Sequence, residues 1–437
     1  MRTTVSFPVS DVSEYKASLL GWSKQFKEIV WLDSNAHADT YGSFEAMLAV
    51  DAAHRIVVRR TTGAFNKLRT YRKERSDWLF GFLSYDLKNG VEDLSSTNFD
   101  GLLFPNLFFF QPKKIIKITN GYMYFMYLDA YAQEIQVDYN AIFEKKIPAL
   151  QPPATEDIHI KMRIFKDEYF QRARAMLAHI HRGDIYEANF CQEFYAKNTV
   201  INPLHVYEKL NAISQPPFAV FLKHDDNYLL CASPERFLKK QGNQLISQPI
   251  KGTAKRHSNP KEDAALIEKL QHDEKERAEN IMIVDLVRND LSKSAVKGSV
   301  KVERLCEVKS YRQVHQMVST ISAEVASNAD PVALIRENFP MGSMTGAPKV
   351  SAMKIIEELE SFKRGLYSGA VGYFTPEGDF DFNVVIRSIL YNAAKEYVSF
   401  SVGSALTAKA IPEKEYEECL LKAKAMREVL ENHQGDS

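Results

Sequence analysis

Hydrophobic residues in the first third of the chain fall in short runs that are typical of β-strands. Residues 78–86 (WLFGFLSYD), 101–110 (GLLFPNLFFF) and 121–128 (GYMYFMYL) are rich in aromatic and branched side chains, which are favoured in strands. The run at 101–110 is the most apolar, but it is short and interrupted by Pro105, so a buried strand is favoured over a membrane span. The pattern predicts a β-rich N-terminal part.

Beyond residue 160 the spacing of apolar residues alternates between helix and strand. In 167–183, Phe170, Ala173, Leu177 and Ile180 share one helical face, and Gly183 follows as a stop. A hairpin is predicted over 368–390, with its turn at PEGD. Further helices are predicted at about 261–293, 348–360 and 413–432, and strands at 217–223, 228–238 and 244–250.

A proline-containing segment supplies the best candidate boundary. Residues 145–157 (KKIPALQPPATED) hold three prolines flanked by charges, which interrupt periodic structure. The boundary separates an N-terminal β-rich part, 1–150, from a second part, 160–430. We expect both parts to fold into one compact unit.

Composition excludes several classes of protein. The 437-residue chain has 45% hydrophobic and 26% charged residues, as soluble globular proteins do. Lys+Arg and Asp+Glu are both 56, so no net charge attracts the chain to nucleic acid or to an anionic membrane. The four cysteines form no CxxC pair, and the N-terminus lacks an apolar signal region. We therefore expect a cytoplasmic protein with neither a zinc site nor a disulfide framework.

Lys251 raises the first chemical question. In QPIKGTAKR (248–256) it stands between a strand end and a Gly-Thr pair, and glycine permits close approach of a ligand. On residue type alone an exposed, solvated lysine is favoured. A buried, reactive amine is the alternative.

Acidic residues recur at helical spacing in two segments. Glu276 and Glu279 lie beside an apolar face in 273–290, and Glu415, Glu418 and Lys422 border an apolar stripe in 413–430. Taken singly, each segment is typical of a salt-bridged surface helix. If the two helices converge, their carboxylates would suit Mg²⁺, which prefers oxygen ligands and retains waters.

Three glycine-containing or strand-end segments are candidates for contacts with an anion. Residues 339–360 form a glycine-rich loop before a helix, and either close packing by Gly346 and Ala347 or a ligand role fits it. It is not a GxxxxGK[ST] loop, because Val350 stands where that motif needs a hydroxyl. Arg387 ends an apolar run, and Gly403 with Ser404 is expected at the end of a strand.

The order and wording of these segments resemble one family, the chorismate-utilising enzymes. The similarity is continuous over about 160–430, and GFLSYDLKN (81–89) extends it more loosely. Such an ordered set is far more specific than a lone motif. The resemblance implies an α+β fold of two large, mostly antiparallel sheets packed as a sandwich with helices outside. The motifs are SPERF (233–237), PIKGT (249–253), RAENIMIVDLVRND (277–290), GAPK (346–349), GYF with IR (372–387) and EYEECLLKA (415–423).

Within the family the chain is most similar to the aminodeoxychorismate synthases, which carry a lysine in PIKGT where anthranilate synthases carry alanine. The resemblance implies that Lys251 attacks C2 of chorismate while Glu235 protonates the departing C4 hydroxyl. Ammonia then adds at C4 and expels the lysine, in para-aminobenzoate and folate biosynthesis. The amine must be neutral, so we expect burial and Mg²⁺ to lower the pKa of Lys251 from about 10.4.

The remaining site residues are carried over by position. Glu279 and Glu418 match Mg²⁺ ligands, with Glu276 and Glu415 acting through water. The other matches are Gly252 and Thr253 beside the ring, Tyr373 and Arg387 at the enolpyruvyl carboxylate, Gly403, Ser404 and Ala405 as carboxylate contacts, and Lys422 balancing charge near the metal.

Three positions depart from the family pattern or separate its members. Gln316 replaces a histidine, so an acid–base role there is not expected. The carboxylate loop is VGSAL instead of three glycines. Glu187 occupies the place of the lysine with which isochorismate and salicylate synthases activate water, which disfavours water addition.

Two alternatives and two accessory sites complete the expectations. The runner-up function is anthranilate synthase component I, and a chorismate-binding regulatory module without turnover is a third possibility. The resemblance locates a tryptophan pocket at WLDSN (31–35) and QPPFAVF (215–221). No cysteine lies in a nucleophile elbow, so we expect a separate glutamine amidotransferase subunit to deliver ammonia.

Overall fold

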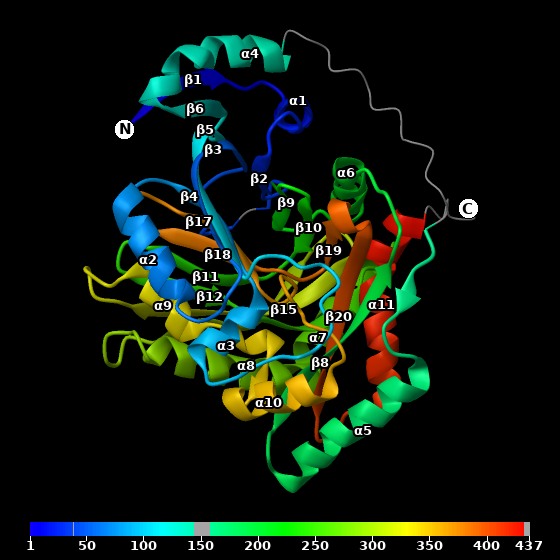
Figure 1. Cartoon of the computed structure of the whole chain (residues 1–437). Helices are drawn as coiled ribbons and strands as arrows, with labels where there is room; N and C mark the ends of the chain where they lie inside the picture. The colour runs from blue at the N-terminus through cyan, green and yellow to red at the C-terminus, as the bar shows by residue number, and fades with distance from the viewer. Residues whose placement is uncertain (38, 144–157, 432–437) are drawn as a thin grey trace.

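The computed structural model describes residues 1–37, 39–143 and 158–431, and it has the α+β sandwich architecture that the resemblance implied (Figure 1). Every strand-to-strand pairing is antiparallel, and pairings join all the strands into one continuous network. This network forms two layers connected by two long strands, β3 (Ala46–Val58) and β5 (Leu107–Thr119).

The first layer contains strands from both the N-terminal and the C-terminal part of the chain. β8 lies beside both β7 and β16 at one end of this layer. In spatial order from there the strands are β8 (Glu187–Ala196), β20 (Tyr397–Thr407), β19 (Ser388–Asn392), β10 (Asn227–Ser233), β9 (Phe218–His224), β2 (Glu28–Asp33), β3, β5, β6 (Tyr122–Leu128) and β1 (Arg2–Pro8), with β7 (Lys161–Met162) and β16 (Gly346–Ala347) on β8.

The second layer starts from the other halves of β3 and β5. β15 lies at its far end and pairs with β12, β13 and β14. In spatial order the strands are β5, β4 (Leu79–Leu83), β17 (Ala370–Phe374), β18 (Phe380–Val384), β11 (Arg236–Gln241), β12 (Gln244–Gln248) and β15 (Val314–Glu324), followed by β13 (Ile250–Lys255) and β14 (Lys301–Ser310).

Strand periodicity explains how one sequence fills two cores. In β2, Val30 and Leu32 belong to the apolar cluster that joins the two layers, whereas Ile29 and Trp31 belong to the cluster beneath the outer helices. The helices of that outer cluster are α1 (Val12–Ser23), α4 (Ile135–Phe143), α5 (Lys166–Arg182), α6 (Pro203–Ser214), α10 (Lys349–Leu359) and α11 (Pro412–Glu431). The other helices are α2 (Ala64–Arg75), α3 (Lys88–Val91), α7 (Pro260–His272), α8 (Glu274–Ser292) and α9 (Pro331–Asn338).

The predicted elements are largely confirmed. α5 ends at Gly183, whose φ of 89° is the left-handed conformation that glycine adopts readily. The hairpin is β17–β18. The stretch predicted as one helix over 261–293 is two, because Asp273 ends α7 and caps α8 by accepting from the Glu276 N–H.

The two parts of the chain contribute to both layers. β2 pairs with β9, and β4 pairs with β17. The predicted boundary at 145–157 lies outside the described residues. No helix within the described ranges is long and apolar enough to cross a membrane, and the four cysteines are free and buried.

Candidate active site

Lys251 is a partly buried residue, not the exposed lysine that its residue type favours. Its side chain is 12% exposed, and Nζ donates a hydrogen bond to Oε1 of Glu187 at 2.8 Å. Burial lowers the pKa of this amine, but the charges of Glu187, Glu279 and Glu418 outweigh burial and raise the pKa above its usual range. Without a bound metal, the expectation of a lowered pKa for Lys251 is therefore wrong. That expectation did not consider the ion pair between Lys251 and Glu187.

Glu235 lies between β10 and β11, with its carboxyl group buried. Ser343 donates from Oγ to Oε1 of Glu235 at 2.6 Å. Burial raises the pKa of Glu235 to about 7, although Ser343 and Lys251 both oppose the shift. A carboxyl that retains its proton near neutrality fits the expected proton donor. Ser343 was not identified from sequence, because its partner lies 108 positions away along the chain.

The acidic residues of α8 and α11 differ in their environments. Glu279 is buried, and burial raises its pKa to about 7. Burial also acts on Glu418, but Lys422 outweighs it and lowers the pKa of Glu418. Lys422 makes an ion pair with Glu418 at 2.6 Å. Lys275 lies 3.6 Å from Glu279 and 3.4 Å from Glu415, so it joins the two helices electrostatically.

This set of donors fits a hard divalent cation. Oε1 of Glu279 is buried without a hydrogen bond, and Lys275 lies 3.6 Å from it, so a closer cation would compensate its charge better. Mg²⁺ commonly binds one or two protein carboxylates and completes its shell with water and substrate oxygens. Glu279 and Glu418 would hold it, with no histidine or cysteine needed.

A tighter acidic cluster elsewhere is already neutralised by the protein. The ligand atoms of Glu28, His224 and Asp225 lie within 4.8 Å of one another. Arg55 contacts Glu28 at 2.7 Å and Asp225 at 3.1 Å. We assign no metal to this cluster.

The segment Gly403–Ala405 lies inside β20, which continues to Thr407, and not at the strand end as predicted. Gly403 faces Cys191, whose N–H donates to Glu360 and not to β20. Gly403 therefore belongs to a non-hydrogen-bonded pair, and its N–H points away from β8, as does that of Ala405 two residues later. Ser404 has the opposite orientation, so its amide is engaged with β8 and the prediction of an amide contact there is wrong.

Arg387 and Gln316 line one pocket together with Lys422. Arg387 adopts a left-handed φ of 52° between β18 and β19. Arg387 is partly buried, and burial lowers its pKa against the opposing effect of Tyr367 and Glu418. Gln316 has its Oε1 buried without a hydrogen-bond partner. The pocket thus presents two cations and an unsatisfied acceptor, which fits a carboxylate ligand that also has a donor group.

Gly252 and Thr253 lie next to Lys251 on β13. Gly252 has φ of 94°, and a Cβ there would lie 3.2 Å from Glu276 Oε2. Thr253 pairs with Gln316 of β15. These two residues therefore bring the lysine strand close to both α8 and the Arg387 pocket, as their expected position beside the ring requires.

Tyr373 is not near Arg387, contrary to the prediction. It lies on β17, stacks on Trp78 with ring centroids 5.5 Å apart, and lines a different pocket. The tyrosine that acts electrostatically on Arg387 is Tyr367, six residues earlier. Two tyrosines lie on the same apolar segment, and only the fold shows which one faces the site.

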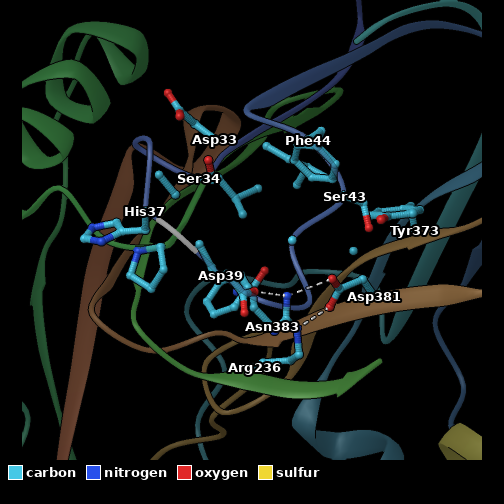
Figure 2. Close-up of a pocket in the computed structure, with 17 residues that line it drawn as sticks. Asp33, Ser34, His37, Asp39, Ser43, Phe44, Arg236, Tyr373, Asp381 and Asn383 are labelled. Atoms are coloured by element: carbon cyan, nitrogen blue, oxygen red, sulfur yellow. Dashed lines mark hydrogen bonds and ion pairs between the residues drawn. The ribbon is translucent and has the colours of Figure 1, made fainter. Parts of the chain in front are cut away.

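The second pocket lies where the resemblance located the tryptophan site (Figure 2). Residues 32–34 and 217–220, from the two predicted segments, line it. Figure 2 shows Arg236 between Asp39 and Asp381, with ion-pair distances of 2.7 and 2.9 Å. Arg236 directly follows Glu235 along the chain, but Glu235 does not line this pocket. Its ligand stays a prediction.

The chain is similar to known proteins of one family. Residues 25–428 match the family described as chorismate binding enzyme. Aminodeoxychorismate synthase component 1 of Bacillus subtilis is 32% identical over 80% of this chain and 76% of its own length. Anthranilate synthase component 1 of Thermus thermophilus is 31% identical over 80% of this chain and 77% of its own length.

Other relatives are longer proteins. A probable chloroplastic aminodeoxychorismate synthase of Oryza sativa subsp. japonica is 43% identical over 61% of this chain, and the chain spans 30% of that protein. Among solved structures, the menaquinone-specific isochorismate synthase MenF of Escherichia coli has a TM-score of 0.78 at 18% identity, covering 98% of this chain and 94% of that one. At that identity the likeness shows the fold alone.

The family match spans nearly the whole chain and includes every strand and helix that carries the candidate site. The chain therefore belongs to the chorismate-binding enzymes. Several of its relatives are named aminodeoxychorismate synthase.

Proposed function

We propose that this enzyme converts chorismate and ammonia into 4-amino-4-deoxychorismate through a covalent bond to Lys251. One observation carries the proposal: a partly buried lysine, Lys251, and a buried carboxyl, Glu235, that act on each other electrostatically. A nucleophile and a proton donor near each other are what displacement of a hydroxyl requires.

The steps follow from the roles of these two residues. The Nζ lone pair of Lys251 forms a bond to C2 of chorismate, the ring electrons shift, and the C4–O bond breaks. Glu235 gives its proton to the departing hydroxyl, which leaves as water. Ammonia then bonds to C4, and the C2–Nζ bond breaks to release the lysine.

The surrounding residues bind and orient the substrate. Arg387 and Lys422 offer positive charge to a carboxylate, and the outward amides of Gly403 and Ala405 offer hydrogen bonds. Mg²⁺ bound by Glu279 and Glu418 would neutralise the ring carboxylate. Removal of those two negative charges from the surroundings of Lys251 would also reduce the shift that now raises its pKa.

Anthranilate synthase component I is the second candidate, favoured by the identity to the Thermus thermophilus protein. The assay that separates the two candidates supplies chorismate, Mg²⁺ and ammonium and follows the product. Anthranilate is aromatic and fluorescent, whereas 4-amino-4-deoxychorismate is neither. Fluorescent anthranilate as the main product would overturn the proposal, and chorismate binding without any product would indicate the regulatory module.

We further propose that ammonia comes from a separate glutamine amidotransferase subunit. Relatives named component 1 support a second component. The cysteines support it as well, because burial raises the pKa of Cys231 to about 11 and that of Cys419 to about 12. Thiols that stay protonated are poor nucleophiles for amide hydrolysis.

A further inference from the structure

Glu187 is the immediate neighbour of the candidate nucleophile, and the mechanism above gives it no role. It lies at the start of β8, where its partner across the ladder is Thr407 of β20. Its backbone pairs with Ala347 of β16 on the other side. A residue held by strands on both sides has a fixed position, which is the first requirement for a proton-transfer group.

The contact with Lys251 is short and largely shielded from solvent. Glu187 is 1% exposed, and its Oε1 lies 2.8 Å from Nζ of Lys251. The other oxygen, Oε2, is buried and has no hydrogen-bond partner. No other carboxylate of the described chain forms an ion pair with Lys251, because Glu279 and Glu418 act on it only at longer range.

The chemistry of the nucleophile leaves a proton to be placed. Lys251 is surrounded by the charges of Glu187 on β8, Glu279 on α8 and Glu418 on α11, and by Glu235 beyond them. These charges favour the ammonium form, which has no lone pair for attack. The proton must leave before the C2–Nζ bond forms, and a buried site gives little access to water as its acceptor.

We propose that Glu187 is a catalytic residue that accepts this proton from Lys251 and returns it at the end of the cycle. This inference rests on the proposed function. Glu187 takes one N–H proton into Oε1 as Nζ bonds to C2, and Glu235 gives its own proton to the leaving hydroxyl. After ammonia bonds to C4 and the neutral lysine leaves, Glu187 protonates the lysine again, and the new C4 ammonium group returns a proton to Glu235. Chorismate and ammonia have then become 4-amino-4-deoxychorismate and water, with both carboxyl groups restored.

The roles of the two glutamates are thus distinct. Glu235 exchanges its proton with C4 substituents, whereas Glu187 stores the proton of the nucleophile. The unpartnered Oε2 of Glu187 gives the carboxyl group room to rotate or to hold the proton away from Nζ. An amide at this position can accept a hydrogen bond from Lys251 but cannot store its proton.

The test compares Glu187→Gln with Glu187→Asp under saturating chorismate, Mg²⁺ and ammonium. We expect Glu187→Gln to lower kcat about 100-fold or more at pH 7.5, as loss of a general base does, while the dissociation constant for chorismate changes less than about threefold. The deficit should shrink as pH rises, because the lysine then loses its proton to solvent. Glu187→Asp should keep a larger share of kcat and the wild-type pH profile.

Glu193→Gln is the matched control. It lies on the same strand, is similarly buried, and pairs with Arg163 at 2.8 Å instead of with Lys251. It should lower stability without changing the pH profile. Wild-type kcat in Glu187→Gln, or an equal pH-independent loss in the Gln and Asp variants, would overturn the role of Glu187.

A second readout separates this inference from the proposed function. Rapid quenching with chorismate and no ammonium, followed by mass analysis, detects the adduct on the Lys251 peptide. Adduct formation that is fast in the wild type and slow in Glu187→Gln supports both. Equal rates in the two proteins would reject Glu187 alone, whereas full activity of Lys251→Ala would reject the covalent mechanism itself.

Discussion

At the scale of single residues, the site brings together an unusually protonated carboxyl and a charged lysine that act on each other electrostatically. Glu235 is held protonated near neutrality by burial, and Lys251 is held charged by its carboxylate neighbours. Burial therefore dominates the pKa of Glu235, whereas neighbouring charges dominate the pKa of Lys251, and these two groups must react together. The protonation of each group can be tested separately.

Replacing Lys251 should abolish turnover while the protein stays folded. We expect Lys251→Ala to lose most chorismate turnover with ammonium. Lys251→Arg should not restore it, because a guanidinium keeps the positive charge but is no nucleophile at neutral pH. Product formation and circular dichroism measure the two properties. Wild-type rates in either variant would reduce Lys251 to an electrostatic role.

Glu235→Gln should separate activity from stability. The folded-state pKa of Glu235 is about 7, above the value of about 4.3 in an unfolded chain. The ionised form of Glu235 is therefore disfavoured in the folded protein. The protein begins to lose stability as the pH rises above the unfolded-state pKa, and the loss is complete above the folded-state pKa. We expect Glu235→Gln to be inactive yet more stable than wild type by about 3–4 kcal/mol at pH 8, and equally stable near pH 4.

Denaturant unfolding at the two pH values measures this effect. Ser343→Ala is a useful companion, since removal of its hydrogen bond to Glu235 takes away an interaction that lowers the pKa. The alkaline limb of kcat/KM should move to higher pH in that variant. No pH dependence of the stabilisation in Glu235→Gln would mean that Glu235 does not titrate in this range.

The sequence identifies residues that stand in distinctive motifs. It does not identify residues whose role depends on where the fold places them. Lys251 and Glu235 stand in short, distinctive motifs. Ser343 and Tyr367 were missed, because a serine in a glycine-rich loop and a tyrosine in an apolar run have no distinctive pattern. The prediction of Tyr373 at Arg387 fails for the same reason, since strand direction and not spacing decides which of two tyrosines faces Arg387.

At the scale of elements, the approach of α8 to α11 creates the candidate metal site. Lys275 links the two helices by contacts to Glu279 and Glu415. Each helix alone has the pattern of a salt-bridged surface helix. Only their convergence around Lys251 distinguishes a ligand site from a solvated face.

Removing Glu279 should therefore act through the metal. We expect Glu279→Gln to lower Mg²⁺-dependent activity on the order of 100-fold or more, since changes in groups behind the ligands already cost about 10–100-fold. Glu276→Gln should have a smaller effect. Titration of Mg²⁺ against activity and chorismate binding provides the measurement, and full activity in excess chelator would contradict the metal assignment.

The junction of β16 with β8 gives a packing prediction. A Cβ on Gly346 would lie 2.1 Å from the carbonyl oxygen of Glu187, far inside van der Waals contact. Gly346→Ala should force the strands apart and lower the free energy of unfolding by about 1–3 kcal/mol. Val350→Ala, at an exposed position nearby, should change it by less than about 0.5 kcal/mol. Equal stabilities of the two variants in denaturant would show that β16 can move at no cost.

How well the sequence predicts the ends of helices depends on the strength of the local signal. Gly183 marked the end of α5 correctly, because its left-handed conformation is a local requirement. Asp273 was not read as a break within 261–293, since its capping function depends on the backbone turning there. Whether the amides of Gly403, Ser404 and Ala405 face outward depends on pairing with β8, which no local pattern encodes.

At the scale of the whole molecule, we predict that the purified chain uses ammonium but not glutamine. All four cysteines are buried, so no described thiol is exposed for glutamine hydrolysis. The assay supplies glutamine as the sole nitrogen source, with ammonium as the positive control. Robust product from glutamine without a partner would require a nucleophile other than these thiols and would overturn the two-subunit proposal.

The sandwich of two sheets followed from the family resemblance, but their connection did not. Alternation in the strands predicts two buried faces and not which strands are neighbours. β3 and β5 continue from one layer into the other, with a register shift near Asp51, whose φ is 60°. A bend of this kind depends on long-range pairing, which is invisible in local sequence.

The pairing of β4 with β17 has a consequence for how the chain is made. Residues 79–83 leave the ribosome long before residues 370–374, their neighbours in the sheet, and β2 likewise waits for β9. Until those partners are synthesised, the early strands expose open edges that can join other chains. The nascent protein should therefore depend on chaperone protection until most of it has been translated, and the first 150 residues produced alone should aggregate.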